Sequence, residues 1–448
     1  MQRTHARLIR LSVLALLLSA CAQFPVNPPL ERWEPHALME AAPASGRRPD
    51  LLLIVALSGG GTRAASFGYG VLEQLRDTTF EQDGTTRRLL DEIDLITGVS
   101  GGSFVAAYYG LHGDGIFEHF EERFLRRNVQ RGLVLGLLNP VNWFRLASPR
   151  FGRSDLATEY YDEHVFKGAT FADLAQGPGA DVAINATDMV RGNRFSFRQV
   201  ELDYLCSDLS KIPIARAVAA SAAFPGPLTP VILRSYAGTC GFEPPAWIEE
   251  TLAAGGPSRR RLRQARLLKS YLDPDRPYVY LLDGGIADNL GIRAAVERVA
   301  GAGSFRRVLE WGGMQETRQI LMIVVNAEVE PELEKEGRML KAGLAGLVGT
   351  ASGIQIRSLN FEMIELVRSS FEQWARQLTQ YHGEPVEFRL VDLHFDRVTN
   401  PELRRKLKNV PTSLSLPDED VDLLRETGRE LLRESPVFRE AVERIRQP

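Results

Sequence analysis

Short apolar runs recur along the chain, each about the length of a buried strand. The six clearest lie at residues 51–57, 94–99, 181–187, 278–282, 320–327 and 386–395. Stretches with helix-like periodicity separate them, and no internal repeat is visible. Strands that alternate with helices are typical of a mostly parallel sheet covered by helices on both faces. The pattern therefore predicts an α/β fold.

Two glycine-rich turns follow the first two runs. The strand at 94–99 enters the sequence Gly-Val-Ser-Gly-Gly at 98–102, a G-x-S-x-G nucleophile elbow with a helical pattern behind it. Such a turn exposes the hydroxyl of Ser100, and the small residues Gly98 and Gly102 avoid clashes where strand and helix meet at a sharp angle. This pattern is typical of a serine hydrolase.

The other turn, Ser-Gly-Gly-Gly-Thr-Arg at 58–63, follows the strand at 51–57 and opens a second helix. The glycines Gly59, Gly60 and Gly61 can point backbone N–H groups at an anion, as an oxyanion hole requires. A plain tight turn or half of a phosphate loop is the alternative. The segment lacks both the G-K-[S/T] ending of a P-loop and the G-x-G-x-x-G spacing of a dinucleotide fold.

A third motif, Asp283-Gly284-Gly285, ends the strand at 278–282. A carboxylate at the end of a buried strand costs desolvation free energy unless it has a partner, and the flanking glycines allow a close approach. An ordinary turn or a helix N-cap is the alternative reading, although Asp288 fits the cap better.

In this order the three motifs resemble those of the patatin-like phospholipases, and the segment 219–230 resembles that family's helix-then-proline segment. The resemblance covers about residues 50–330 and implies a three-layer α/β/α fold. It also implies a Ser–Asp dyad without a catalytic histidine: Ser100 as nucleophile, Asp283 as general base, the backbone of Gly59–Gly61 as oxyanion hole and Arg63 as a brace. Ala64 departs from the plant enzymes, which usually carry another glycine there.

The implied reaction is hydrolysis of lipid acyl esters, of the phospholipase A or lysophospholipase type, without a cofactor. No Cys/His spacing suggests a metal site. Two alternatives remain. One is an α/β-hydrolase triad, because His382 and His394 both follow Asp283 in the order that such a triad requires. The other is a non-catalytic lipid-binding lipoprotein of the cell envelope.

The N-terminus has the pattern of a targeting segment. Arg3, Arg7 and Arg10 precede an apolar stretch at 11–18 that is too short to span a bilayer. Leu-Ser-Ala-Cys at 18–21 resembles a bacterial lipobox, which predicts a signal peptide at 1–20 and lipidation of Cys21, for example with palmitate. Ala22 behind the cysteine implies the outer membrane. The alternative is an ordinary signal peptide with an incidental cysteine.

Four parts are therefore expected along the chain. The signal peptide (1–20) precedes a lipidated, proline-rich tether (21–49) that reaches up to about 80 Å when extended. A catalytic domain (50–330) follows, and then an extension (331–448) that completes the sheet and adds amphipathic helices. Removing residues 1–20, with three arginines and no acids, changes the formal net charge from −3 to −6. A mildly acidic protein argues against a nucleic-acid partner.

Three further features leave alternatives open. Cys206 and Cys240 form either a disulfide, which an oxidising periplasm permits, or two separate thiols. The apolar stretch at 132–146, broken by Gly and Pro, is either an acyl-binding or interfacial cap or a buried core helix. The arginine-rich insertion at 234–277 either meets anionic lipid headgroups or forms a solvated helix face.

Overall fold

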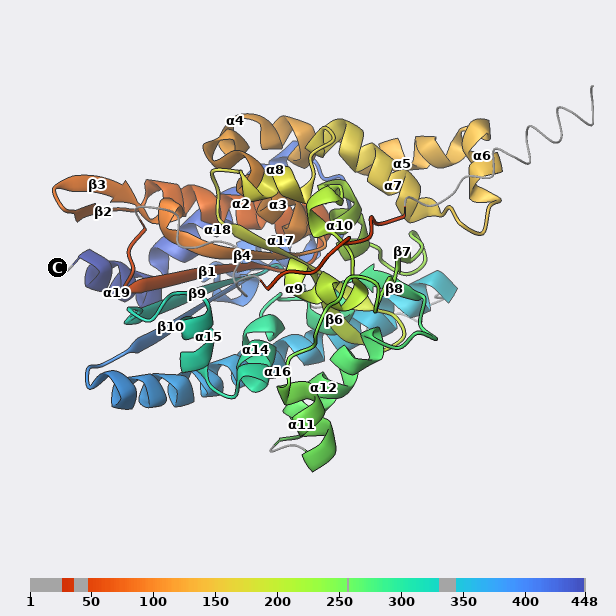
Figure 1. The fold of residues 1–448 in the computed structure, drawn as a ribbon. Helices are drawn as coiled ribbons and strands as arrows, with labels where there is room; N and C mark the ends of the chain where they lie inside the picture. The colour runs from red at the N-terminus through yellow and green to blue at the C-terminus, as the bar shows by residue number, and fades with distance from the viewer. Residues whose placement is uncertain (1–25, 36–46, 256–257, 330–343, 447–448) are drawn as a thin grey trace, which may run out of the picture.

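The computed structural model describes residues 26–35, 47–255, 258–329 and 344–446 (Figure 1). The predicted signal peptide and Cys21 lie outside the described residues. Among the described residues, no helix combines the length and the apolar character needed to cross a bilayer.

A single eight-stranded sheet forms the centre of the molecule, in the order β10-β9-β1-β4-β5-β8-β7, with β6 also paired to β5. The five strands from β10 to β5 are parallel, whereas β6, β8 and β7 pair antiparallel. The strands are β1 (Leu51–Leu57), β4 (Ile93–Val99), β5 (Asp181–Asp188), β6 (Asn193–Phe197), β7 (Val231–Arg234), β8 (Tyr278–Asp283), β9 (Gln319–Asn326) and β10 (Glu387–His394). The mostly parallel α/β prediction is confirmed, and each of the six predicted runs is a strand.

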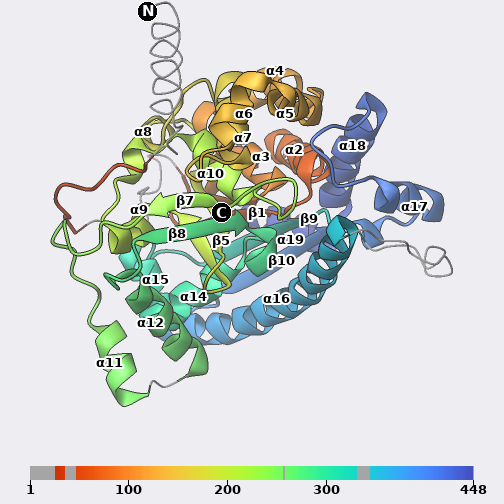
Figure 2. The ribbon, with the colours of Figure 1, turned by 90° about the vertical axis from the view of Figure 1, so that its right-hand side faces the viewer.

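Helices cover both faces of this sheet, because its central strands are apolar on both sides. In β1, Leu53 and Val55 pack into one core, and Leu52 and Ala56 pack into another. Figure 2 shows α2 and α3 on one face and the long α16 across the other. The helices of the first face include α2 (Gly61–Asp77), α3 (Gly101–His112), α7 (Arg153–Tyr161), α10 (Ile214–Ser221), α18 (Asp418–Glu434) and α19 (Pro436–Arg446). Those of the second include α14 (Arg293–Ala302), α15 (Phe305–Trp311) and α16 (Leu344–His382).

The remaining elements are short or peripheral. They comprise the hairpin β2 (Thr79–Gln82) and β3 (Thr85–Arg88), and the helices α4 (Ile116–Phe120), α5 (Val129–Leu138), α6 (Pro140–Leu146), α8 (Phe171–Ala175), α9 (Gln199–Leu202), α11 (Trp247–Ala254), α12 (Arg259–Tyr271), α13 (Gly285–Asp288) and α17 (Pro401–Asn409). In the arginine-rich α12, Arg263 donates to Asn193, Lys269 pairs with Glu249, and Arg261 lies over the ring of Trp247. Three of the basic side chains of α12 therefore already contact other residues of the protein.

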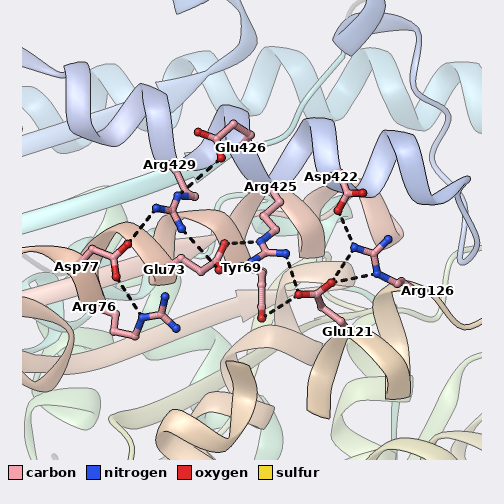
Figure 3. Close-up of polar contacts among 10 residues, drawn as sticks. All are labelled: Tyr69, Glu73, Arg76, Asp77, Glu121, Arg126, Asp422, Arg425, Glu426 and Arg429. Carbon is pink, nitrogen blue, oxygen red and sulfur yellow. Dashed lines mark hydrogen bonds and ion pairs between the residues drawn. The ribbon is translucent and has the colours of Figure 1, made fainter. Parts of the chain in front are cut away.

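The C-terminal extension is built into the domain. β10 pairs with β9 along its whole length, and α18 packs closely against α2. Figure 3 shows the ion pairs between these helices: Glu73, only 2% exposed, receives two 2.6 Å bonds from Arg425, which also reaches Glu121 at 2.9 Å. Since α2 begins at the glycine-rich turn 58–63, α18 holds the helix on which that turn depends.

Replacing Gly70 by alanine is expected to destabilise the protein by about 3 kcal/mol, because overpacked sites cost this much. A Cβ at Gly70 would lie 1.9 Å from the carbonyl oxygen of Arg425, which is backbone and cannot rotate away. Thermal and urea unfolding measure the effect. Gly136→Ala is the control, since a Cβ there meets nothing within 4 Å. Equal stability of the two variants would contradict the close α2–α18 contact.

Residues 26–35 belong to the proline-rich tether expected at 21–49, and the structure shows them docked onto the domain. The side-chain amide of Asn27 donates to Ser207 Oγ (2.8 Å) and to the Arg234 carbonyl (2.9 Å), and its oxygen accepts from the Arg234 N–H. The N–H groups of Leu30 and Trp33 donate to the carbonyls of Cys206 and Cys240. Buried polar groups that find partners here make docking favourable in spite of the prolines.

Cys206 and Cys240 form a disulfide, with a Cα–Cα distance of 5.6 Å. This decides between the two alternatives that the sequence left open. The bond joins the two segments on which residues 30–33 lie.

Candidate active site

Ser100 occupies a strained turn between β4 and α3. Its backbone angles are φ 49° and ψ −119°, a region that residues with a side chain rarely adopt. The turn is possible because glycines surround it at backbone contact distance. A Cβ at Gly98 would lie 2.6 Å from Ser103 Cα, and one at Gly101 would lie 2.0 Å from the Gly61 carbonyl oxygen. Gly102 is equally constrained, by the carbonyl of Leu57 at 2.5 Å.

Two other serines hold the backbone of Ser100 from both sides. The N–H of Ser100 donates to Ser221 Oγ (2.8 Å), which in turn donates to the Asn185 carbonyl (2.6 Å). The hydroxyl of Ser103 donates to the Ser100 carbonyl (2.5 Å). Ser221 was not assigned a role from the sequence. Its only signal was its position in the alanine-rich segment before the prolines.

Strand register brings Asp283 level with Ser100. Val99 of β4 pairs with Asn185 of β5, and the next residue, Ala186, pairs with Asp283. Because β8 is antiparallel to β5, the end of β8 does not belong to the carboxyl edge shared by the parallel strands. The register across β5 therefore provides the alignment of Asp283 with Ser100.

Asp283 is buried, with 6% of its surface exposed, and the Ser100 hydroxyl donates a hydrogen bond to it. Its Oδ1 also accepts from the N–H of Gly285 at 2.8 Å. Burial raises the pKa of Asp283 to about 6, and the bonds from Gly285 and Ser100 limit the rise. Gly284 is required for close packing, since a Cβ there would lie 2.3 Å from the Asn185 carbonyl oxygen.

The glycine loop lies directly beside the serine. A Cβ on Gly59 would stand 3.4 Å from Ser100 Cβ, and Gly60 and Gly61 have positive φ angles of 144° and 63°. The N–H of Gly59 already donates to the Asn289 carbonyl (3.1 Å). Within the described part of the chain, the N–H groups of Gly60 and Gly61 have no acceptor. They point from the N-terminus of the 17-residue helix α2, whose first turn carries no acidic residue.

Arg63 lies behind this loop rather than in it. Its buried guanidinium donates to the carbonyls of Ala327 and Val410, each at 2.9 Å, and burial lowers its pKa to about 10. These bonds tie the start of α2 to the end of β9 and to the C-terminal extension. Arg63 thus has the position of a brace.

Two residues outside the sequence motifs complete the surroundings. The side-chain oxygen of Asn289 lies 2.6 Å from the Cβ position of Gly59 and 3.0 Å from that of Gly285, so it fills the space between both glycine turns. Ser413 of the extension accepts from the Thr62 N–H (2.8 Å) and pairs with Gly61. The sequence offers no local signal for either residue, and it predicts no role in the site for the extension.

The two candidate histidines of a triad lie elsewhere. His394 ends β10, which is separated from β4 by β9 and β1, and its ring nitrogens face Asp392 and Asp396. His382 ends α16. None of the histidines that the structure describes is hydrogen-bonded or ion-paired to Asp283.

The sequence profile of the patatin-like phospholipases matches residues 55–296, more than half of the chain. The chain belongs to the patatin-like phospholipase family. The family resemblance that the three sequence motifs predicted is thus confirmed. A search of curated proteins found no significant match.

Solved structures with a similar chain path include human GIVD cytosolic phospholipase A2, at 13% identity and a TM-score of 0.41. The match covers 88% of this chain and 61% of the human chain, so the protein spans less than two thirds of that enzyme. Another is the type III effector protein ExoU, at 16% identity and a TM-score of 0.24, with 89% of this chain and 79% of ExoU covered.

Gly59→Ala is expected to lower kcat at least about a hundredfold, because a small displacement of reacting groups has effects of this size. The added methyl would collide with Asn289 Oδ1 at 2.6 Å and move the loop away from Ser100. Steady-state kinetics with a soluble nitrophenyl ester measure the loss. Gly353→Ala is the control, since its nearest neighbour is the end of a flexible arginine at 3.5 Å. Unchanged kinetics for Gly59→Ala would contradict the placement of the loop.

Proposed function

We propose that the protein is a membrane-anchored acyl hydrolase of the phospholipase A or lysophospholipase type that works through a Ser100–Asp283 dyad. One observation carries the proposal. A partly exposed serine on a strained turn is hydrogen-bonded to a buried carboxyl group of raised pKa, beside two N–H groups that have no acceptor among the residues the structure describes.

In the first half of the reaction, Ser100 Oγ attacks the ester carbonyl and its proton passes to Asp283. The N–H groups of Gly60 and Gly61 bind the tetrahedral oxyanion, and the positive end of the α2 dipole adds to its stabilisation. Asp283 then protonates the leaving alcohol, and the acyl group stays on Ser100.

In the second half, Asp283 takes a proton from the water that attacks the acyl-enzyme. It returns this proton to Ser100 Oγ as the bond to the acyl group breaks and the fatty acid leaves. A carboxylate of ordinary pKa near 4 is a weak base for this task. The raised pKa of Asp283, about 6, brings the group closer to the operating pH. Because N–H groups fixed by the backbone need no reorganisation, the glycine loop supplies a large part of the rate.

The test is release of fatty acid from phosphatidylcholine and lysophosphatidylcholine in mixed micelles by the purified full-length protein. Mass spectrometry of the products identifies the ester bond that is cleaved. Folded protein that binds the micelles but releases no fatty acid from either lipid would overturn the proposal in favour of the non-catalytic lipoprotein.

We also propose that Cys21 carries the lipid anchor and that Ala22 directs the protein to the outer membrane of a bacterial envelope. The lipobox-like sequence at 18–21 supports this. Cys21→Ser is expected to lose incorporation of radiolabelled palmitate and to accumulate as an unprocessed precursor. Equal labelling of the variant and the wild type would refute the lipidation of Cys21.

A further inference from the structure

Helices α5 and α6 expose an apolar surface that the active site does not use. We call residues 129–146 the α5–α6 hairpin, and Figure 1 shows it at one end of the molecule. Six of its large apolar side chains are 46–68% exposed: Val134, Leu135, Leu138, Val141, Trp143 and Phe144. The alternative of a buried core helix at 132–146 is therefore wrong. Contiguous apolar surface on a protein usually marks a site of interaction.

The hairpin is ordered by its own hydrogen bonds. Asn139 Oδ1 accepts from the Val141 N–H (3.1 Å), and the side-chain amide of Asn142 donates to the Gly136 carbonyl (2.8 Å). The indole N–H of Trp143 donates to the Leu137 carbonyl (2.9 Å). These polar groups at the connection therefore have partners within the hairpin. If its apolar side chains left water, few of the polar groups would lose a hydrogen bond.

The sequence of the hairpin and its flanks carries basic residues and no acidic ones, although Arg145 is paired with Glu159 of α7 and Arg126 with Glu121 and Asp422. From Arg123 to Ser154 the chain contains no Asp or Glu, but it contains the arginines at positions 123, 126, 127, 131, 145, 150 and 153. Arg131 and Arg150, on either side of the apolar residues, are exposed. Exposed Trp, Phe and Leu flanked by arginine are typical of segments that lie in the interface of an anionic bilayer.

The hairpin also starts at the rim of the active site. The Gln130 N–H donates to the Leu414 carbonyl (3.3 Å), and the Ser413 hydroxyl is bonded to Gln130 Oε1 (2.8 Å). Ser413 is the residue whose carbonyl binds Thr62 of the glycine loop. Behind the hairpin, α7 is joined to α10, the helix that ends at Ser221, by the buried ion pair of Asp155 and Arg216 (2.9 Å).

We propose that the apolar side chains of the α5–α6 hairpin insert into the headgroup–acyl boundary of a bilayer that contains anionic lipid. This insertion holds the rim of the active site against the membrane, and it adds to any anchor at Cys21. The inference rests on the proposed function because it makes the bilayer the source of substrate. A second copy of the chain fits this surface less well, because the arginines of two hairpins would face each other.

The first experiment reads the position of Trp143 directly. Full-length protein with Cys21→Ser and Ser100→Ala, which removes the predicted anchor and prevents digestion, is mixed with vesicles of phosphatidylcholine and phosphatidylglycerol that carry brominated acyl chains. Tryptophan emission is expected to be quenched. Trp143→Phe should remove most of the quenching, whereas Trp311→Phe, on α15 and 44% exposed, should not. Equal quenching in the Trp143→Phe variant would overturn the insertion of the hairpin.

The second experiment, in the Cys21→Ser background, compares exposed apolar side chains of the hairpin with an equally exposed phenylalanine on α16. Phe144→Ser combined with Leu138→Ser is expected to weaken partitioning into the same vesicles by at least about tenfold. Phe361→Ser, on α16 and 68% exposed like Phe144, should leave partitioning unchanged. Hydrolysis of vesicle phospholipid should fall with partitioning, while hydrolysis of a soluble nitrophenyl ester should stay within about twofold, because the hairpin does not touch Ser100 or Asp283.

The remaining outcomes separate the two proposals. If the double variant hydrolyses vesicle lipid as the wild type does, the hairpin inference fails and the proposed function stands. If the wild type hydrolyses neither vesicle lipid nor soluble ester, the proposed function fails, while quenching of Trp143 still decides insertion. If the double variant loses self-association on size exclusion but keeps its partitioning, the hairpin is a contact between copies and the inference is overturned.

Discussion

Ser100→Ala is expected to abolish ester hydrolysis, with a loss in kcat on the order of 10⁴-fold or more, because no acyl-enzyme can form without the hydroxyl. Folding should be unaffected, since Ser100 uses only its backbone to hold the turn, through Ser221 and Ser103. Labelling with a fluorophosphonate probe measures the nucleophile directly, and circular dichroism checks the fold.

Ser210→Ala, a change at an exposed serine of a short surface turn, is the matched control and should label as the wild type does. Labelling of Ser100→Ala at wild-type strength, or no labelling of folded wild type, would show that another residue is the nucleophile.

Asp283→Asn should lower kcat about 10³-fold with little change in KM, because the lost proton transfer acts only in the transition state. His382→Ala and His394→Ala should each stay within a few-fold of the wild type, since neither ring is bonded to Asp283. A folded but inactive histidine variant would contradict the dyad and favour a triad.

The pH dependence provides a second test of Asp283. Its carboxyl group acts as a base only when deprotonated, so kcat/KM of the wild type should rise with pH through a limb near 6, which Asp283→Asn removes. The raised pKa also affects stability. The folded state binds this proton more tightly than the unfolded state, so its contribution is present below pH 4 and is lost as pH rises to about 6.

Asp283→Asn should therefore be more stable than the wild type at pH 8, by up to about 3 kcal/mol, and not below pH 4. Thermal unfolding at the two pH values measures the difference. Asp275→Asn, at an exposed position, should show no such pH-dependent gain. If the difference in stability between Asp283→Asn and the wild type is the same at both pH values, burial does not raise the pKa of Asp283.

The sequence predicted the six strands and the turns at the three motifs, because strands and turns depend on local sequence signals. Apolar runs such as 51–57 and 320–327 mark strands that are buried on both faces, and glycines mark turns where backbones touch. The partners were not local. That β8 pairs antiparallel to β5, and so reaches Ser100, depends on contacts between segments about a hundred residues apart.

The sequence did not identify the single polar residues that support the site, for the same reason. Ser221, Asn289 and Ser413 support the site through bonds to distant segments, and no spacing rule identifies such residues in advance. For the α5–α6 hairpin, the sequence showed a local apolar pattern but not whether it is buried. Its apolar residues match a core helix as well as an exposed cap, because burial is decided by what packs against a segment and not by the segment itself.

The docking of residues 26–35 limits how far the domain could lie from a membrane in which Cys21 is anchored. If Cys21 carries the anchor, only the five steps from Cys21 to Val26 precede the docked segment, a reach of about 18 Å. That is less than the thickness of the hydrocarbon core of one bilayer, about 30 Å. With an anchor at Cys21, so short a connection would confine the catalytic domain to the leaflet that holds the lipid. The rate would then follow the mole fraction of substrate lipid within that leaflet, and lipid in other membranes would contribute nothing.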